Sequence, residues 1–307
     1  MAVTFRNDLG NLIIPGSYEI FKKALGDVQQ IEYTMLVSER TTVRAQEYFD
    51  TIGNLSPAAI KSEGDEIKYD RFQYNFRTTL TPTTKAKGVS SSVESFEDDL
   101  YGVMDKVFGA ELVKKMVLAK EIEVSAAYNG AFAATGGDGV YIFSASHPLK
   151  NSVLLNDNLA TGALSFDNIV AAKNKFNHIY DQAGQLFDTY PTHIVIHPDK
   201  FYILAAILES VLRPFELSNT KNNVQDKYNL QIIQNKRIDM NTTTGVSKWF
   251  LLDKTCQGAG CILLKRQGMK MSSYQDDKTK DYRADVYERY ITQFVAPGYG
   301  IVGSTGA

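Results

Sequence analysis

The chain has 307 residues, of which 44% are hydrophobic and 22% charged, enough to bury a sizeable core in one to three domains. Its 33 basic and 35 acidic side chains give a formal net charge of −2. This balance argues against a dedicated reader of nucleic-acid grooves, because such proteins are usually strongly basic. No apolar run approaches the ~20 residues of a membrane span, and the N-terminus lacks a signal-peptide pattern, so we expect no membrane association and folding in a cytoplasm.

The first 30 residues predict an irregular arm that contains a short helix. Pro15 suits the start of this helix and Gly26 its end. Ile20, Phe21 and Leu25 then share one apolar face.

An extended hairpin is predicted over about residues 40–85. Residues 31–55 are rich in β-branched and aromatic side chains, which favours strands. Further on, Phe72, Tyr74 and Phe76 alternate with polar residues, the period of a strand with one buried face. Because an isolated hairpin is marginal in water, this one needs another domain or molecule to lie against.

One long helix is predicted over about residues 105–132. This stretch contains no proline, and Val113, Val117, Val124 and Tyr128 recur near helical spacing. The lysines Lys114, Lys115 and Lys120 are expected on other faces. A helix of about 25 residues spans roughly 38 Å, a length that suits a spine.

A compact α/β unit is predicted over about residues 145–270. One helix begins with Ser165 as N-cap and ends at Gly184. A second helix lies in KFYILAAILES, and strands lie in YPTHIVIHPDK, NVQDKYNLQIIQNKRID, SKWFLLD and GCILLKR. The tail DYRADVYERYITQFVAPG alternates again and predicts a long strand. The side chains expected on one side of it are Tyr282, Ala284, Val286, Tyr290 and Phe294.

The most suggestive cluster for chemistry is Ser144, Ser146 and His147, in DGVYIFSASHPL. A serine hydrolase places its nucleophile on a strained, glycine-flanked elbow, and no glycine flanks either serine. Neighbours in a strand also point to opposite sides, so Ser146 and His147 would not face each other. We interpret this segment as a strand that ends in a turn.

The remaining candidates for chemistry are weaker. His193 and His197 would lie roughly 13 Å apart in a strand, too far to share a metal. Cys256 and Cys261 have no further ligands close in sequence, so we expect reduced thiols. The sequence therefore predicts no catalytic, cofactor-binding or metal site, and it points to assembly instead.

A resemblance to a known family rests on the segment from the long helix to WFLLD. Over about residues 120–255 the chain resembles the major head proteins of tailed bacteriophages, most of all the Mu-type major head subunits. The residues that carry the resemblance are Asp138, Gly139, Phe143, Ser144, His147, Pro148, Asp181, Gly184 and Pro198. None of these positions is catalytic in the family.

The resemblance implies an α+β fold similar to the Hong Kong 97 phage capsid subunit. It implies an N-terminal arm at 1–39, an extended hairpin called the E-loop at 40–85, and an axial domain at 145–270. The peripheral domain would comprise 86–144 and 271–307 and contain the spine helix at about 105–132.

The resemblance also implies a major capsid protein that forms pentamers and hexamers of an icosahedral shell around double-stranded DNA, in the virion and, during assembly, in the host cytoplasm. Its partners would be other copies of itself, a portal, a separate scaffolding protein, possible decoration proteins and, non-specifically, the packaged DNA. The candidate intersubunit contacts are Lys61, Glu63, Asp65, Glu66, Lys68, Phe72, Tyr74 and Phe76. Two alternatives remain open: an encapsulin-type nanocompartment shell and, more distantly, a serine hydrolase.

Overall fold

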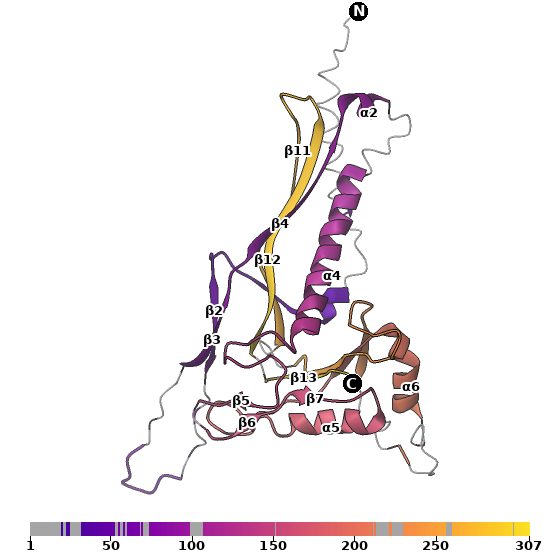
Figure 1. The fold of residues 1–307 in the computed structure, drawn as a ribbon. Helices are drawn as coiled ribbons and strands as arrows, with labels where there is room; N and C mark the ends of the chain where they lie inside the picture. Colours follow the sequence, from indigo (N-terminus) through magenta and orange to yellow (C-terminus); the bar gives the residue numbers. More distant parts are fainter. Residues whose placement is uncertain are drawn as a thin grey trace, which may run out of the picture. The chain divides into compact units, whose positions relative to one another are not determined.

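The fold is seen in a computed structural model of the chain (Figure 1). The structure describes residues 20, 23–24, 32–52, 55, 58, 60–67, 69, 74–98, 107–150, 152–210, 212, 221–222, 230–255, 260–296 and 298–307. The expected helix of the N-terminal arm lies mostly outside these residues. The chain divides into two compact units, and each is a composite of three segments.

The first unit comprises Met1–Ala45, Thr81–Val124 and Leu263–Ile291. It contains a four-stranded sheet with the strand order β1-β11-β12-β4. The bounds of its strands are β1 Ser38–Thr41, β4 Thr83–Ser91, β11 Gly260–Gln275 and β12 Tyr282–Ala296. Its other elements are η1 Glu32–Met35, α2 Val93–Glu97, η2 Val107–Glu111 and the start of α4, Leu112–Gly130.

One face of this sheet packs against α4. Leu112, Val113 and Met116 of α4 form a buried cluster with Ala284 and Val286 of β12. The alternation predicted for the tail strand is confirmed, since Ala284, Val286, Tyr290 and Phe294 are all buried.

The long helix is also confirmed, with a later start than predicted. α4 begins at Leu112, and a π-helical turn, η2, precedes it. The expectation for Lys120 is wrong, because this lysine is only 5% exposed. Spacing explains the error: Lys120 follows Val117 by three residues and precedes Val124 by four, so it falls on the apolar stripe.

The second unit comprises Gln46–Leu80, Ser125–Ile262 and Thr292–Ala307. Its main sheet has five strands in the order β7-β13-β10-β8-β9. Their bounds are β7 Leu159–Ala160, β8 His193–Ile196, β9 Gln231–Gln234, β10 Trp249–Leu252 and β13 Ile301–Ser304. The helices are α5 Phe166–Phe176, η3 Pro198–Lys200 and α6 Phe201–Glu209.

The middle of this sheet is buried on both faces. Strands β10 and β13 are buried at every position, as a strand covered on two sides must be. Residues of α5 and α6 pack with Ile194, Trp249 and Leu251 on one face, and α5 lies along β7 and β13 (Figure 1). The predicted alternation of strands and helices is confirmed here, because β8 and β9 are parallel and α6 lies between them in the chain.

Two of the sequence predictions for this region need correction. Ser165 is the N-cap of α5, as predicted, and accepts a hydrogen bond from the backbone N–H of Asn168 at 3.3 Å. The helix ends at Phe176, however, and not at Gly184. The Asp181 carboxylate accepts the backbone N–H groups of Ala183 and Gln185, which favours a separate turn there.

The prediction for residues 31–55 also needs correction. This region is not one extended stretch, because η1 and two short strands, β1 and β2 (Glu47–Ile52), share it.

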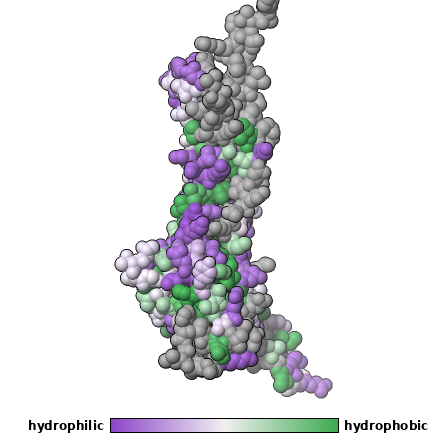
Figure 2. Space-filling view, turned by 90° about the vertical axis from the view of Figure 1, so that its right-hand side faces the viewer, coloured by the Kyte–Doolittle hydropathy of each residue, from purple (hydrophilic) through white to green (hydrophobic). Residues whose placement is uncertain are grey.

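The surface mixes residue types. On the face drawn in Figure 2, hydrophilic and hydrophobic residues alternate in small areas. Several large apolar side chains are nearly fully exposed, among them Ile60, Val153 and Tyr69. None of the helices in the described part of the chain is long and apolar enough to span a membrane.

Candidate functional site: an extended hairpin and a buried Asp–His clasp

The predicted hairpin is formed by β2 and β3 (Tyr74–Leu80), which pair antiparallel in the second unit. The register runs from Glu47 opposite Leu80 to Ile52 opposite Tyr74, with a shift after Asp50. Arg77 holds the two strands together by donating from Nε and Nη2 to the two carboxylate oxygens of Asp50, at 2.7 and 2.9 Å. These hydrogen bonds lower the pKa of Asp50.

Polar contacts, one of them buried, fix the paired strands of the hairpin. Thr51 Oγ1 donates to the carbonyl of Phe76 at 3.2 Å and accepts the N–H of the same residue at 3.0 Å. Thr78 Oγ1, in β3, donates to the carbonyl of Val295 in β12 at 3.1 Å. Gly137 approaches so closely that a Cβ there would lie 2.5 Å from Thr78 Oγ1. Only glycine fits at this position without a shift of the strand.

The tip of the hairpin carries most of the predicted contact residues. Lys61, Glu63, Asp65 and Glu66 are all exposed. A turn orders them, because the N–H of Asp65 donates to the carbonyl of Ser62 at 3.2 Å and Gly64 has a φ of +87°. This positive φ is one that glycine adopts without strain.

The aromatic candidates do not lie at the tip turn. Phe76 and Tyr74 belong to β3. Phe76 is half-buried at the hairpin base and lines a small pocket there. Tyr74 is the first residue of β3. Lys68 and Phe72 lie outside the described residues. The sequence analysis did not single out three apolar side chains near the tip, which are 101%, 60% and 86% exposed: Ile60, Ile67 and Tyr69. Their presence within a charged loop was the signal that could have found them.

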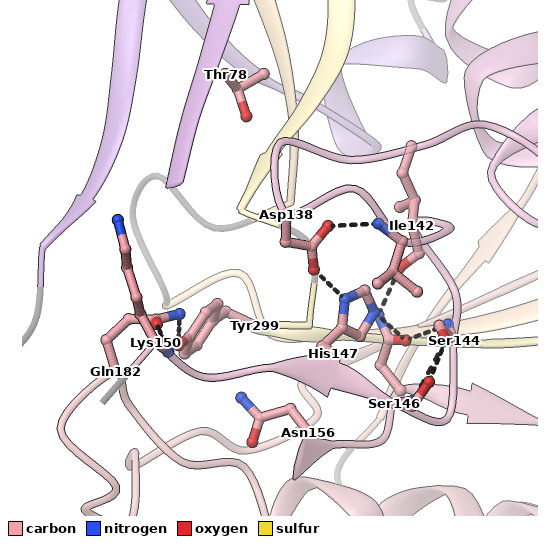
Figure 3. Close-up of polar contacts among 12 residues, drawn as sticks. Thr78, Asp138, Ile142, Ser144, Ser146, His147, Lys150, Asn156, Gln182 and Tyr299 are labelled. Atoms are coloured by element: carbon pink, nitrogen blue, oxygen red, sulfur yellow. Dashed lines mark hydrogen bonds and ion pairs between the residues drawn. The ribbon is translucent and has the colours of Figure 1, made fainter. Parts of the chain in front are cut away.

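Beside the hairpin base, Asp138 and His147 form a buried pair that we call the clasp (Figure 3). Asp138 Oδ2 lies 2.6 Å from His147 Nδ1, with side chains only 5% and 3% exposed. On the other side of the ring, Nε2 lies 3.0 Å from Asn158 Oδ1. Asn158 Nδ2 donates to the carbonyl of Ile142 at 2.8 Å, which orients the amide so that its oxygen faces the ring.

This arrangement engages both ring nitrogens of His147. Asn158 Oδ1 can only accept, so it accepts a hydrogen bond from Nε2. Nδ1 lies 2.6 Å from Asp138 Oδ2, so neither ring nitrogen is turned toward a serine hydroxyl.

The serines do not face this imidazole. Ser144 Oγ lies 3.4 Å from Ser146 Oγ and accepts the backbone N–H of Ser146 at 3.2 Å. The backbone N–H of Ser144 donates to Asn158 Oδ1 at 2.9 Å. A hydrolase needs a nucleophile within hydrogen-bond reach of its base. Here the hydroxyls of Ser144 and Ser146 contact each other and the local backbone, and so shape a turn.

The clasp is packed from all sides. A Cβ on Gly298 would lie 3.2 Å from the His147 ring, and one on Gly303 would lie 2.8 Å from the Phe143 ring. Phe143 in turn stacks with Phe132 and Phe250, at centroid distances of 4.9 and 5.5 Å. Close packing thus surrounds both Phe143 and His147, at Gly303 and Gly298 respectively.

The nearby Tyr299 completes this polar environment. Its hydroxyl accepts a hydrogen bond from Gln182 Nε2 at 3.1 Å. Burial, opposed by this hydrogen bond and helped by Asp181 and Asp138, raises the pKa of Tyr299 to about 12. The residues that line the small pocket between the hairpin base and the clasp are Thr51, Phe76, Thr78, Gly137, Asp138, His147, Pro148, Leu149, Asn156, Gln182, Val295 and Tyr299.

The other sequence candidates are not brought together. His193 Nδ1 lies 2.8 Å from Thr192 Oγ1, whereas His197 Nδ1 accepts the backbone N–H of Asp199 at 3.3 Å. Burial, followed by the charge of Lys254, lowers the pKa of His193. Within the described part of the chain, no group of three His, Cys, Asp or Glu side chains is placed to hold a metal ion.

The two cysteines likewise form no site among the described residues. Cys261 is a buried free thiol at the start of β11. Cys256 lies outside the described residues.

Solved structures show the fold of the chain. The capsid protein of the cyanophage P-SCSP1u matches with a TM-score of 0.59 at 10% identity, over 88% of this chain and 86% of that one. The structure from Mycobacterium phage Adephagia matches with a TM-score of 0.56 at 12% identity, over 99% and 98%. The SrpI encapsulin of Synechococcus elongatus PCC 7942 matches with a TM-score of 0.54 at 11% identity, over 92% and 89%. The chain therefore has a Hong Kong 97-like capsid fold.

The family follows from the sequence itself. The model of the family described as phage capsid protein matches residues 76–299. The chain belongs to this family, and its function is that of the major capsid protein of a tailed phage. No curated protein matches the chain.

Proposed function

We propose that many copies of the chain close into an icosahedral shell around double-stranded DNA by laying the hairpin of each copy on a neighbour. The observation that carries this proposal is the contrast between the two ends of the hairpin. The base is fixed by Thr78 and Gly137, whereas the tip exposes Ile60 and Tyr69 almost completely. Exposed apolar side chains on a projecting element favour a covering partner.

Symmetric closure makes weak contacts sufficient. Each copy would both give a hairpin and receive one, so that pentamers and hexamers bury every tip. Exposed ion pairs contribute only about 0–1 kcal/mol each, so the stability of the shell would come from many contacts together. Among the predicted contact residues, Lys61, Glu63, Asp65 and Glu66 would set the register, and Lys68, Phe72, Tyr74 and Phe76 remain candidates for further contacts.

The finer assignments belong to the same proposal. The domain bounds 1–39, 40–85, 86–144 with 271–307, and 145–270 remain our working division of the chain. The motif from Asp138 to Pro148 supports placing the chain with the Mu-type major head subunits. A separate scaffolding protein, a portal, possible decoration proteins and non-specific contact with packaged DNA complete the expected partners, with assembly in the host cytoplasm.

An encapsulin-type compartment is the second candidate, favoured by the match to the SrpI shell. Electron microscopy of the purified protein tests both. Particles that contain DNA when made with the phage's own assembly partners support the capsid, and particles without DNA that carry a protein cargo support the compartment. A protein that stays monomeric with its partners present would contradict shell formation altogether.

A further inference from the structure

The small cavity of the second unit lies between the base of the hairpin and the clasp (Figure 3). Its lining comes from several parts of the chain: the hairpin strands, the segment that carries the clasp, the turn at Gln182, and the end of β12 with Tyr299 beyond it. The space open to the centre of a water molecule is about 10 Å³. One water needs roughly 10–15 Å³ of such space, so the cavity has room for a single water and for nothing larger.

The wall of this cavity is mostly polar. Most of its lining side chains carry a hydroxyl, a carboxylate, an imidazole or an amide, and the apolar ones are Phe76, Pro148, Leu149 and Val295. Empty cavities in proteins have apolar walls, whereas polar cavities of sufficient size hold ordered water. The composition of the wall therefore favours a hydrated cavity.

The hydroxyl of Tyr299 has a hydrogen bond left to donate at this wall. It accepts one from Gln182 Nε2 at 3.1 Å, and the described residues offer no acceptor for its own proton. Because burial raises the pKa of Tyr299 to about 12, the phenol keeps this proton at neutral pH. A buried hydroxyl proton without an acceptor is costly, so a bound molecule that accepts it would stabilise the fold.

Two other groups of the wall can accept hydrogen bonds. Thr78 Oγ1 donates its proton to the carbonyl of Val295 at 3.1 Å, and the described residues send no donor to its lone pairs. The Asp138 carboxylate contacts His147 Nδ1 through Oδ2 and accepts the N–H of Val140 through Oδ1 at 3.3 Å. Each carboxylate oxygen can accept a second hydrogen bond. One unused donor thus shares the cavity with unused acceptors.

We infer that one ordered water molecule occupies this cavity as a constant part of the fold. The water accepts the O–H of Tyr299 and donates its two protons to Thr78 Oγ1 and to the Asp138 carboxylate. Its hydrogen bonds join β3 of the hairpin, the clasp and the segment after β12. A bridging water of this kind is nearly as favourable in enthalpy as a direct hydrogen bond. The inference concerns a single subunit and does not rest on the proposed function.

A water fits the chemistry of the site better than a cation does. Asp138 is the only carboxylate in the wall, and it already lies against His147. No group of three His, Cys, Asp or Glu side chains within the described ranges is placed to hold a metal ion. The proton of the Tyr299 hydroxyl needs an acceptor, which water is and a cation is not.

A density map that resolves ordered waters tests the site, either from a crystal of the subunit or from assembled particles. We expect one peak in the cavity, within about 2.5–3.0 Å of the Tyr299 hydroxyl oxygen. An empty cavity in a map that shows other buried waters would overturn the inference. A peak that thallium(I) replaces would identify a monovalent cation and overturn it as well.

Two pairs of matched variants assign the hydrogen bonds of this water. Tyr299→Phe removes the donor and should weaken the peak, whereas Tyr290→Phe removes a buried hydroxyl of the first unit and should leave it unchanged. Thr78→Val removes an acceptor and should also weaken the peak, whereas Thr78→Ser keeps the hydroxyl and should retain it. A peak of unchanged strength and position in both Tyr299→Phe and Thr78→Val would rule out the proposed contacts.

Hydrogen exchange measures what the water contributes to the base of the hairpin. The amides of β3 should exchange about fivefold faster in Tyr299→Phe than in the unaltered protein, the factor that corresponds to about 1 kcal/mol for one net hydrogen bond. In Tyr290→Phe the same amides should exchange at the unaltered rate. Equal exchange of β3 in all three proteins would mean that no water ties Tyr299 to the hairpin, and the inference would be wrong.

Discussion

Lys120 Nζ of α4 lies 2.7 Å from Glu288 Oε2 of β12, and the two side chains are only 6% and 2% exposed. The contact is an ion pair more than an aligned hydrogen bond, because Oε2 has no hydrogen-bond partner of good geometry among the described residues. Two cations, Lys85 and Lys120, lie over the ring of Tyr290, at 5.8 and 5.6 Å from its centroid. This buried polar cluster fixes α4 to the sheet of the first unit at one register.

Removing one partner of this pair is expected to destabilise the subunit strongly. Glu288→Gln or Lys120→Met leaves an uncompensated buried charge, which costs about 3–5 kcal/mol. The double variant Lys120→Met/Glu288→Leu should recover most of this loss, since well-packed apolar residues often replace a buried pair at little cost. Urea unfolding of the isolated subunit measures both, with the exposed Lys114→Met as control. Equal losses in the single and double variants would contradict the pairing.

The clasp predicts that substitution of His147 lowers the stability of the subunit much more than substitution of the serines beside it. His147→Ala leaves the buried carboxylate of Asp138 without its partner and should cost about 3–5 kcal/mol of unfolding free energy. Ser144→Ala and Ser146→Ala should cost much less, because those hydroxyls bond one another and the local backbone near the surface. Thermal unfolding and particle yield give the comparison. A serine variant as damaging as His147→Ala would show that the turn, and not the clasp, organises this segment.

The absence of a side chain at Gly137 is expected to be required for the position of β3 at the base of the hairpin. In Gly137→Ala the new Cβ would lie 2.5 Å from Thr78 Oγ1 and 2.9 Å from the carbonyl of Arg77, so β3 must shift, at about 1–3 kcal/mol. Gly130→Ala is the matched control, because nothing lies within 4 Å of a Cβ there and the change favours the end of α4. Hydrogen exchange of β2 and β3 follows the local effect. If both variants exchanged alike, the close approach at Gly137 would not hold the hairpin.

Much of the fold could be predicted from alternation and helical spacing. The period of two in residues 282–294 is enough by itself to place Ala284, Val286 and Tyr290 on the buried side. Glu288 follows the same alternation and so lies on the buried side of β12, and Lys120 falls on the apolar stripe of α4. Two opposite charges at buried positions were thus visible in the sequence, but their pairing depends on the register between a helix and a strand 168 positions later, which local patterns do not contain.

The clasp could not be predicted, for a related reason. The prediction of a strand that ends in a turn is wrong for this segment, because turns, bends and one isolated bridge occupy residues 137–146 and the strand β5 comprises only His147–Pro148. The partners of His147 are Asp138 and Asn158, which reach it through loops. Loop conformation depends on glycines such as Gly139, with a φ of +82°, and on packing by Phe143. For the contact residues, composition indicated the charged tip, but only the structure places Phe76 inside the paired strands, where its backbone N–H donates to Thr51 Oγ1.

Buried tyrosines are expected to make the folded subunit sensitive to alkali. Burial raises the pKa of Tyr299 to about 12, and burial together with nearby carboxylates also raises the pKa values of Tyr33 and Tyr290. In the unfolded chain these phenols titrate near ~10. Because the folded pKa values are higher, the stabilisation is fully present below pH ~10 and is lost as the pH rises toward the folded values.

Stability measured by urea unfolding should therefore fall steeply above pH ~10, with tyrosinate absorbance rising at the same time. Tyr290→Phe should flatten this fall at no cost near neutral pH, because the buried Tyr290 hydroxyl has no hydrogen-bond partner among the described residues. Tyr299→Phe should also flatten it but should lose stability at neutral pH, since Gln182 Nε2 would be left unpaired. A stability profile that stays level from pH ~9 to ~12 would mean that these phenols ionise freely in the folded subunit.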